Sequence, residues 1–309
     1  MSKQSAVIGM LVWLIGVGYL RPHPFDTSWA HAILGFAPLV IVPLAAHVVM
    51  LSDDVSLWWQ RARLAQLPAA ILFAVALILP QGWQSALLSL PWFLVALMFA
   101  GVGLANLTRH GIRSPERLGV SAGMIMLLVG ASWAMLDRWG MRPLKFEPVI
   151  VLLTAIHFHY AGFALPILAG LVAPWGSQAW GMRIVAAVIL SVPAVAIGIT
   201  ATQLQLQPIF ETMAAWLMSL AGTLVSWSYW RQASQTRWPA SSRRLWRFAS
   251  AALAAGMVLS LLYGSRQLTD VSWLDIPWMR ALHGTANAFG FTLVALWGWA
   301  VVRRQPGFS

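Results

Sequence analysis

Residues 149–166 have the sequence VIVLLTAIHFHYAGFALP, in which a long apolar run leads into His157, His159 and Tyr160. The apolar character continues to about residue 172, and about 20 such residues are enough to cross the hydrocarbon core of a membrane as a helix. Ionisable side chains at that depth are costly, so they usually serve a function. The stretch therefore predicts a membrane-spanning helix with a functional site inside it.

The composition of the whole chain is that of a membrane-embedded protein. Its mean hydropathy is +0.72, and only 9% of its 309 residues are charged, against about 25% in soluble domains. Ten spans of about 20 residues use most of this length. We therefore expect an all-α, polytopic bundle of about ten helices that forms one integral membrane domain over residues 1–309. The absence of cysteine excludes disulfides, thiolate metal sites and cysteine catalysis.

Ten apolar runs are the expected spans, and they cover residues 5–20, 29–51, 66–80, 86–107, 117–137, 148–172, 181–202, 209–230, 245–264 and 278–302. No clear cleavage site follows the first run, so we expect a retained helix and not a signal peptide. Many of the 19 Trp residues lie at predicted span ends, as interfacial anchors do, and Trp238 is one of them.

The distribution of the 20 Lys and Arg residues predicts the orientation. Most of them lie at the two termini and in the loops after the second, fourth, sixth and eighth runs. By the positive-inside rule, both termini are expected in the cytoplasm. Basic residues confined to loops argue against a nucleic-acid partner.

Helical geometry separates the two histidines of the opening motif. His157 is expected about 14 Å below the outer edge of a core about 30 Å thick. Residues two apart differ by about 200° around a helix, so His157 and His159 point to nearly opposite sides and are not a chelating pair. Thr154 and Tyr160 share the flank of His157, where the Thr154 hydroxyl is placed to fix its tautomer. Pro166 is expected to kink the helix and to free a backbone carbonyl.

The tenth run supplies the expected partner of this motif. His283 and Asn287 are four residues apart and share one helix face, and Asn287 is expected about 14 Å deep, level with His157. Small neighbours allow another helix to approach closely, namely Gly284, Ala286, Ala288 and Gly290. We predict a site with His157, His159 and His283 as acid, base or relay groups. The expected substrate-binding groups are Thr154, Tyr160, Asn287 and Glu211.

Structural roles compete with this interpretation. A single intramembrane His or Asn often makes only an interhelical hydrogen bond, and His31, near the end of its run, is interpreted in that way. Asp137 is expected in a loop as a solvated acid. Two imidazoles near the midplane exceed what helix packing requires, which favours a functional role for His157 and His159.

A weak similarity links the second, sixth and tenth runs. Each carries a histidine before a Gly-Phe pair: His31 before Gly35-Phe36, His159 before Gly162-Phe163, and His283 before Gly290-Phe291. The spacing differs among the three, so we infer no internal repeat.

Several strings together resemble a known family. They are Gly130-Ala131-Ser132-Trp133, residues 138–146, residues 283–291 and above all Leu153-Thr154-Ala155-Ile156-His157-Phe158-His159-Tyr160-Ala161-Gly162-Phe163. In these the chain is similar to the YndJ-like family of bacterial membrane proteins, over most of its length. The resemblance implies a multi-span architecture and a location in a bacterial cytoplasmic membrane. The family is sometimes labelled transporter-like but has no established activity, so the resemblance assigns no residue a role. Lys145 departs from the glycine expected before the phenylalanine.

Two functions fit these observations best. The first is a transporter-like protein whose buried His, Tyr and Asn side chains hold a small solute or relay protons. The alternative is a membrane-embedded enzyme, a histidine acid/base isomerase or cyclase acting on a lipophilic substrate. Metal or haem binding and a purely structural role are further alternatives. We expect membrane lipid and a small-molecule or lipophilic substrate as partners, no nucleic acid, no metal and no cofactor; the oligomeric state is left open.

Overall fold

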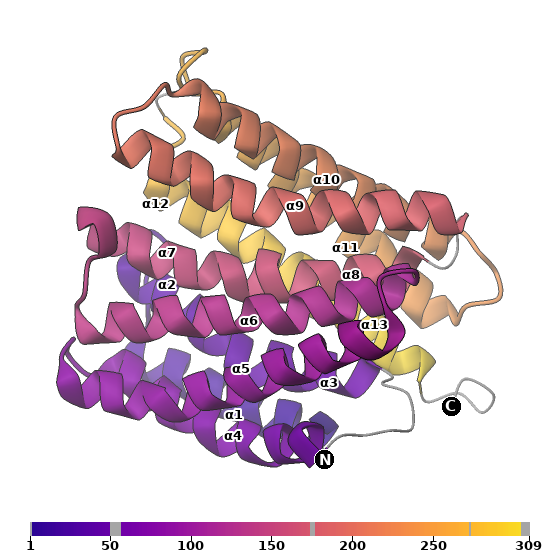
Figure 1. Ribbon diagram of the computed structural model, residues 1–309, viewed down its shortest axis with the longest axis horizontal. Coiled ribbons are helices and arrows are strands. Elements are labelled where there is room, and N and C mark those ends of the chain that lie inside the picture. Colours follow the sequence, from indigo (N-terminus) through magenta and orange to yellow (C-terminus); the bar gives the residue numbers. More distant parts are fainter. Residues whose placement is uncertain (1, 50–56, 174–176, 272, 304–309) are drawn as a thin grey trace. The chain divides into compact units, whose positions relative to one another are not determined.

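The computed structural model describes residues 2–49, 57–173, 177–271 and 273–303, and every regular element in these ranges is a helix (Figure 1). The described residues include ten helices long and apolar enough to cross a membrane, which confirms the polytopic all-α prediction. Their bounds are Lys3–Leu20, Thr27–Val48, Leu57–Ile78, Trp83–His110, Pro115–Trp139, Pro148–Val172, Gln178–Gln203, Ile209–Ala233, Ala240–Gly264 and Ile276–Val302.

The largest difference from the predicted spans is at the third one. Helix α4 covers Leu57–Ile78, whereas its apolar run begins only at residue 66. The helix therefore starts before its sequence becomes apolar, in a segment that contains Trp58, Arg61 and Arg63. The predicted end of the second span at residue 51 falls outside the described residues.

The chain packs as two compact units, which are described separately. Unit 1 comprises Met1–Ile112 and Val120–Ile167, and unit 2 comprises Arg113–Gly119 and Leu168–Ser309.

Unit 1 contains the first spans and most of the sixth. Its helices are α1 (Ser2–Leu20), α2 (Thr27–Phe36), α3 (Val42–Val48), α4, α5 (Trp83–His110), α7 (Pro148–His157) and all but the start of α6 (Pro115–Trp139). A short 3₁₀ turn, η2 (Pro143–Lys145), precedes α7. Helices α4 and α5 pack against each other as a hairpin, and α1 packs against the second span.

Unit 2 contains the last four spans and most of α8 (Leu165–Val172). Helices α9 (Gln178–Gln203), α10 (Ile209–Ala233) and α11 (Ala240–Gly264) follow one another as packed neighbours (Figure 1). Helix α11 also packs along the final span, which runs from α12 (Ile276–Trp278) to α13 (Val294–Val302).

Three spans within the described residues contain π-helical segments. These are η1 (Ala37–Ile41) in the second span, η3 (Phe158–Ala164) in the sixth, and η5 (Met279–Gly284) with η6 (Ala286–Leu293) in the tenth. They are the three spans that share a histidine followed by a Gly-Phe pair. Isolated π-helical turns are uncommon and often mark functional sites.

Prolines explain two of these segments. Val42, which precedes Pro43, donates its N–H to the carbonyl of Ala37. Leu165, which precedes Pro166, donates its N–H to the carbonyl of Tyr160. Each of these hydrogen bonds therefore joins residues five positions apart. A proline lacks an N–H and clashes with the preceding turn of an α-helix, and a wider turn accommodates it. The disturbance expected at Pro166 thus takes the form of η3.

Carbonyl groups in the second span accept side-chain hydrogen bonds from other spans. The N–H of Ala37 donates to the carbonyl of Leu34. The carbonyl of the residue before it, Ile33, accepts the Tyr160 hydroxyl at 2.8 Å. The Pro38 carbonyl accepts the side-chain amide of Gln66. Backbone groups at membrane depth require such partners, so these two carbonyls link the second span to the sixth span and to α4.

Candidate functional site

His159 lies in the interior of unit 1 with both ring nitrogens engaged. Its Nδ1 is 2.8 Å from the Ala155 carbonyl oxygen, and its Nε2 is 3.0 Å from the indole nitrogen of Trp92. A carbonyl only accepts and an indole only donates, so Nδ1 carries the proton and Nε2 accepts. His159 and Trp92 are both completely buried. This histidine is therefore fixed as one neutral tautomer.

Close packing around His159 depends on Gly130 of α6. A Cβ atom at Gly130 would lie 2.8 Å from the Nδ1 atom of His159, well inside van der Waals contact. The glycine of the Gly130-Ala131-Ser132-Trp133 string thus makes room for the imidazole of the sixth span.

The other polar residues of the motif have different surroundings. Tyr160 is buried and donates to Ile33 of the second span. The Thr154 hydroxyl donates to Ile150 of its own helix at 2.7 Å, so its proton is not directed at His157. His157 is half-buried and meets the Phe158 ring edge to face at 5.4 Å. Of the two histidines, His157 is the one that keeps some exposure.

His283 and Asn287 form a hydrogen-bonded pair in unit 2, as their spacing predicts. Nε2 of His283 is 3.1 Å from Nδ2 of Asn287, and Nδ1 is 2.8 Å from the Gly256 carbonyl oxygen. Both side chains are half-buried. The Oδ1 atom of Asn287 is buried and has no hydrogen-bond partner among the described residues.

Small residues bring α11 and the tenth span together around this pair. A Cβ atom at Gly256 would lie 2.6 Å from Oδ1 of Asn287, and one at Gly290 would lie 2.8 Å from Cβ of Ala252. The close helix approach predicted from the small residues of this span is confirmed at Gly290.

The two histidine environments differ in what they allow chemically. The side-chain amide of Asn287 carries a donor, Nδ2, and an acceptor, Oδ1. Rotation of this amide by a half-turn therefore brings Oδ1, in place of Nδ2, to face Nε2 of His283. His283 can therefore be neutral and accept from Nδ2, or doubly protonated and donate to Oδ1 and Gly256. If His159 were doubly protonated, its Nε2–H would instead face the indole N–H of Trp92, which has no acceptor to offer.

Glu211 forms an ion pair at the ends of three helices of unit 2. One carboxylate oxygen is 2.7 Å from the Arg266 guanidinium, and the other accepts the Thr202 hydroxyl at 2.7 Å. Both oxygens are thus occupied by neighbouring protein groups.

A polar cluster in unit 1 corrects the interpretation of Asp137 as a solvated loop acid. Asp137 lies within α6, and its residue exposure is 2%. Its Oδ2 is 2.7 Å from the guanidinium of the adjacent Arg138, which is equally buried, and Gln81 donates to Oδ1 at 3.3 Å. Desolvation of a carboxylate is tolerated because these donors compensate its charge.

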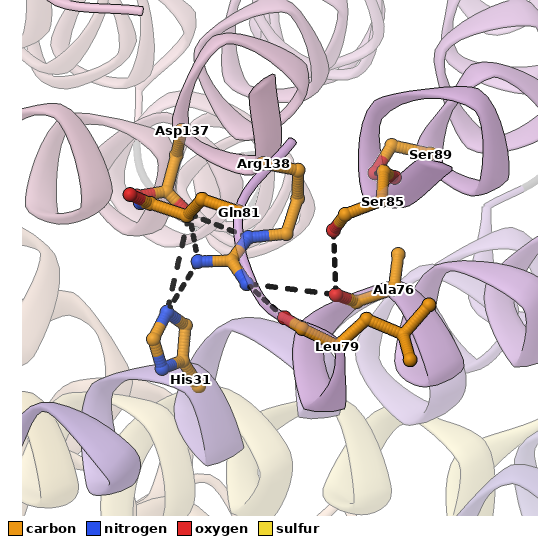
Figure 2. A network of polar contacts seen from close by, with 8 residues as sticks. All are labelled: His31, Ala76, Leu79, Gln81, Ser85, Ser89, Asp137 and Arg138. Carbon is orange, nitrogen blue, oxygen red and sulfur yellow. Dashed lines mark hydrogen bonds and ion pairs between the residues drawn. The ribbon is translucent and has the colours of Figure 1, made fainter. Parts of the chain in front are cut away.

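Arg138 ties three elements together in this cluster (Figure 2). Nη2 donates to Nε2 of His31 at 2.8 Å, while Nη1 points at the carbonyls of Ala76 and Leu79 at the end of α4. A guanidinium only donates, so His31 accepts and, like His159, is held neutral. The hollow beside Gln81 and Asp137, which Arg142 also lines, has no room for a water-sized sphere.

The predicted site residues fall into both units. Thr154, His157, His159 and Tyr160 belong to unit 1, and Glu211, His283 and Asn287 belong to unit 2. Convergence of the sixth and tenth spans stays a prediction. Among the described residues, no group of three or more His, Asp or Glu side chains is arranged to hold a metal ion.

Sequence reasoning did not identify Trp92, Arg138 and Gln81 as partners. Trp92 offered a signal, because it lies inside an apolar run and not at its end, and a buried indole N–H requires an acceptor. Arg138 and Gln81 gave none, since residues at span ends are usually solvated.

Comparison with known proteins gives the same family throughout. The model of the family described as YndJ-like protein matches residues 32–291. The Uncharacterized membrane protein YndJ of Bacillus subtilis (strain 168) is 27% identical over 311 residues, which cover 98% of this chain and 54% of that protein. The chain thus spans about half the length of this curated relative. No solved structure matches.

Proposed function

The chain belongs to the YndJ-like family of membrane proteins, and on that premise we propose that it is a transporter-like protein of the bacterial cytoplasmic membrane. It moves protons, alone or with a small polar solute, by way of His283 and Asn287 in its tenth span. His157 is the relay candidate of the sixth span, and His159, held by Trp92 and Ala155, has a structural role.

One observation carries this proposal, namely the partner of the His283 imidazole. Nε2 of His283 faces the amide of Asn287 at 3.1 Å, and an amide can serve either protonation state of the ring. Nε2 of His159 faces an indole, and Nε2 of His31 faces a guanidinium, so each of those rings has a donor that cannot become an acceptor. A proton carrier must be stable with and without its proton, and His283 meets that requirement.

The local backbone supports the same role. His283 and Asn287 lie in η5 and η6, and π-helical turns are often retained where they position functional groups. The unpartnered Oδ1 of Asn287 adds a hydrogen-bond acceptor that a protonated imidazole or a solute N–H or O–H group can use.

Proton flux into proteoliposomes tests the proposal. Purified protein is reconstituted with a pH-sensitive dye inside the vesicles, and a potassium diffusion potential drives protons inward. We expect flux above that of empty vesicles, and a loss of roughly tenfold or more in His283→Gln and Asn287→Leu, as for other positioned acid/base groups.

The matched control is Asn106→Leu, which removes another intramembrane amide, one that donates to Ser121 in unit 1 at 2.7 Å. This variant is expected to keep the flux of the unmodified protein. The proposal would be refuted if vesicles with the unmodified protein showed no more flux than empty vesicles, or if His283→Gln left the flux unchanged.

A further inference from the structure

Five arginines gather at the turn that joins α10 to α11 in unit 2. They lie within residues 231–247, and no acidic residue occurs between Glu211 and Asp270. Four of the five are exposed and one is half-buried. They are Arg231, Arg237, Arg243, Arg244 and Arg247, and they are called the arginine surface below.

The turn that carries these side chains is anchored in the interior of unit 2. Trp238 was expected to be an interfacial anchor, but it is 3% exposed, and its ring centroid is 5.6 Å from Trp246 and 5.8 Å from Trp299. The Ser242 hydroxyl donates to the Gly298 carbonyl at 2.9 Å. An anchored turn holds its arginines in place, which lowers the entropy lost when they bind a ligand.

Positive charge at this turn is not balanced by the helix that follows it. Helix α11 begins after Pro239; no side chain in the described part of the protein caps it, and its first turn contains no acidic residue. The start of a helix favours negative charge, yet Arg243 and Arg244 lie there. Nε of Arg243 is also buried with no hydrogen-bond partner among the described residues. A bound anion would relieve both deficits.

Exposed aromatic side chains on the same two helices indicate the level of the membrane surface. Trp227 and Trp230 near the end of α10 are 55% and 49% exposed, and Phe248 near the start of α11 is 61% exposed. Aromatic residues of this kind lie at the headgroup level of a bilayer. The arginine surface therefore lies at the depth of lipid phosphates.

We propose that the arginine surface binds the phosphate groups of anionic phospholipids. Guanidinium groups match phosphate oxygens with paired hydrogen bonds, and clustered basic residues beside a membrane span recognise acidic headgroups. The adjoining Trp227, Trp230 and Phe248 favour a lipid over free phosphate, since they provide apolar contacts for its chains. This binding does not depend on His283 or on proton movement.

Titration of short-chain phosphatidylglycerol into the purified protein in neutral detergent, followed by tryptophan fluorescence, tests this site. We expect saturable binding that weakens at high salt and that phosphatidylcholine does not reproduce. In Arg237→Gln/Arg243→Gln/Arg244→Gln the affinity should fall by roughly tenfold or more. The matched control, Arg109→Gln/Arg113→Gln/Arg117→Gln, removes three exposed arginines elsewhere and should retain affinity within about twofold.

Each of the following results would overturn the proposal. Unchanged affinity in the first triple variant would show that the arginine surface is not the site, and an equal loss in the control would show an effect of net charge alone. Inorganic phosphate that competes as well as the lipid does would assign the site to a free anion. If the triple variant does not fold, Arg244→Glu alone is expected to weaken binding by at least fivefold, and unchanged affinity in it would equally refute the site.

Discussion

Nε2 of His283 lies 3.1 Å from Nδ2 of Asn287, so this imidazole faces a group that can donate or accept a hydrogen bond. The pair bridges one turn of a π-helical span, and Gly256 of α11 accepts from the other ring nitrogen. Because the amide can rotate without moving the backbone, Asn287 can offer a hydrogen-bond partner to either protonation state of the ring.

His159 is expected to stabilise the fold and not to move protons. Trp92→Phe leaves its Nε2 buried without a donor, and an unsatisfied buried group costs about 1 to 3 kcal/mol. The apparent melting temperature in detergent should therefore fall. Trp83→Phe is the control, since Trp83 lies on the same helix but is 66% exposed, and a similar loss in both variants would contradict a specific role of the Trp92 hydrogen bond.

Arg138 is expected to be essential to the cluster that holds α4, α6 and the second span together. Arg138→Gln leaves Asp137 as a buried charge without its ion pair, which costs about 3 to 5 kcal/mol. Adding Asp137→Asn removes that charge and should restore much of the lost stability in thermal unfolding. The exposed Arg142 provides the control variant, Arg142→Gln. If the double variant is less stable than the single one, the charge argument is wrong.

Helix α1 should tolerate a methyl group at one glycine and not at another. A Cβ atom at Gly9 would lie 1.8 Å from the Leu39 carbonyl oxygen, whereas one at Gly16 would meet no atom of the described residues within 4 Å. Gly9→Ala must displace backbone in η1, and such overpacking costs about 1 to 3 kcal/mol or more. Gly16→Ala should be neutral or slightly stabilising. Equal thermal stability of the two variants would count against the packing of α1 on the second span.

The predicted orientation can be measured on a chain that has no cysteine of its own. Ser234→Cys, in the turn after α10, is expected to face the cytoplasm, and Gln207→Cys, in the turn before it, the opposite side. Both positions are exposed. A membrane-impermeant thiol reagent added to intact cells should label Gln207→Cys alone. Labelling of Ser234→Cys alone would reverse the orientation derived from the positive-inside rule.

The ten spans were predictable because hydrophobicity over about 20 residues is the dominant constraint in a bilayer. The contact of His283 with Asn287 was predictable as well, since residues four apart meet on one helix face. These features depend on residues that are close in sequence, and their geometry is nearly independent of the rest of the fold.

The partners of His159 and Asp137 were not predictable in that way. Trp92 is separated from His159 by 67 positions, and no periodicity links them. Asp137 lies at the end of an apolar run, where solvation is the usual outcome, and its burial depends on the guanidinium of Arg138 and the amide of Gln81. The π-helical segments were not predictable either: the sequence indicates a disturbance at Pro166 but not a wider turn there, and a regular period of 3.6 residues was assumed for the second and tenth spans.

The central claim, that His283 takes up a proton while His159 and His31 stay neutral, is tested most directly by solid-state nitrogen NMR of the histidine-labelled protein in lipid bilayers. Spectra are recorded as the pH is lowered from about 8 to about 4, and His283→Gln identifies the resonances of His283. The prediction is that its two ring nitrogens change from one protonated and one bare to both protonated, while His159 and His31 each keep one bare nitrogen. A His283 ring that keeps a bare nitrogen over the whole range, or a His159 ring that becomes doubly protonated before it, would contradict the account.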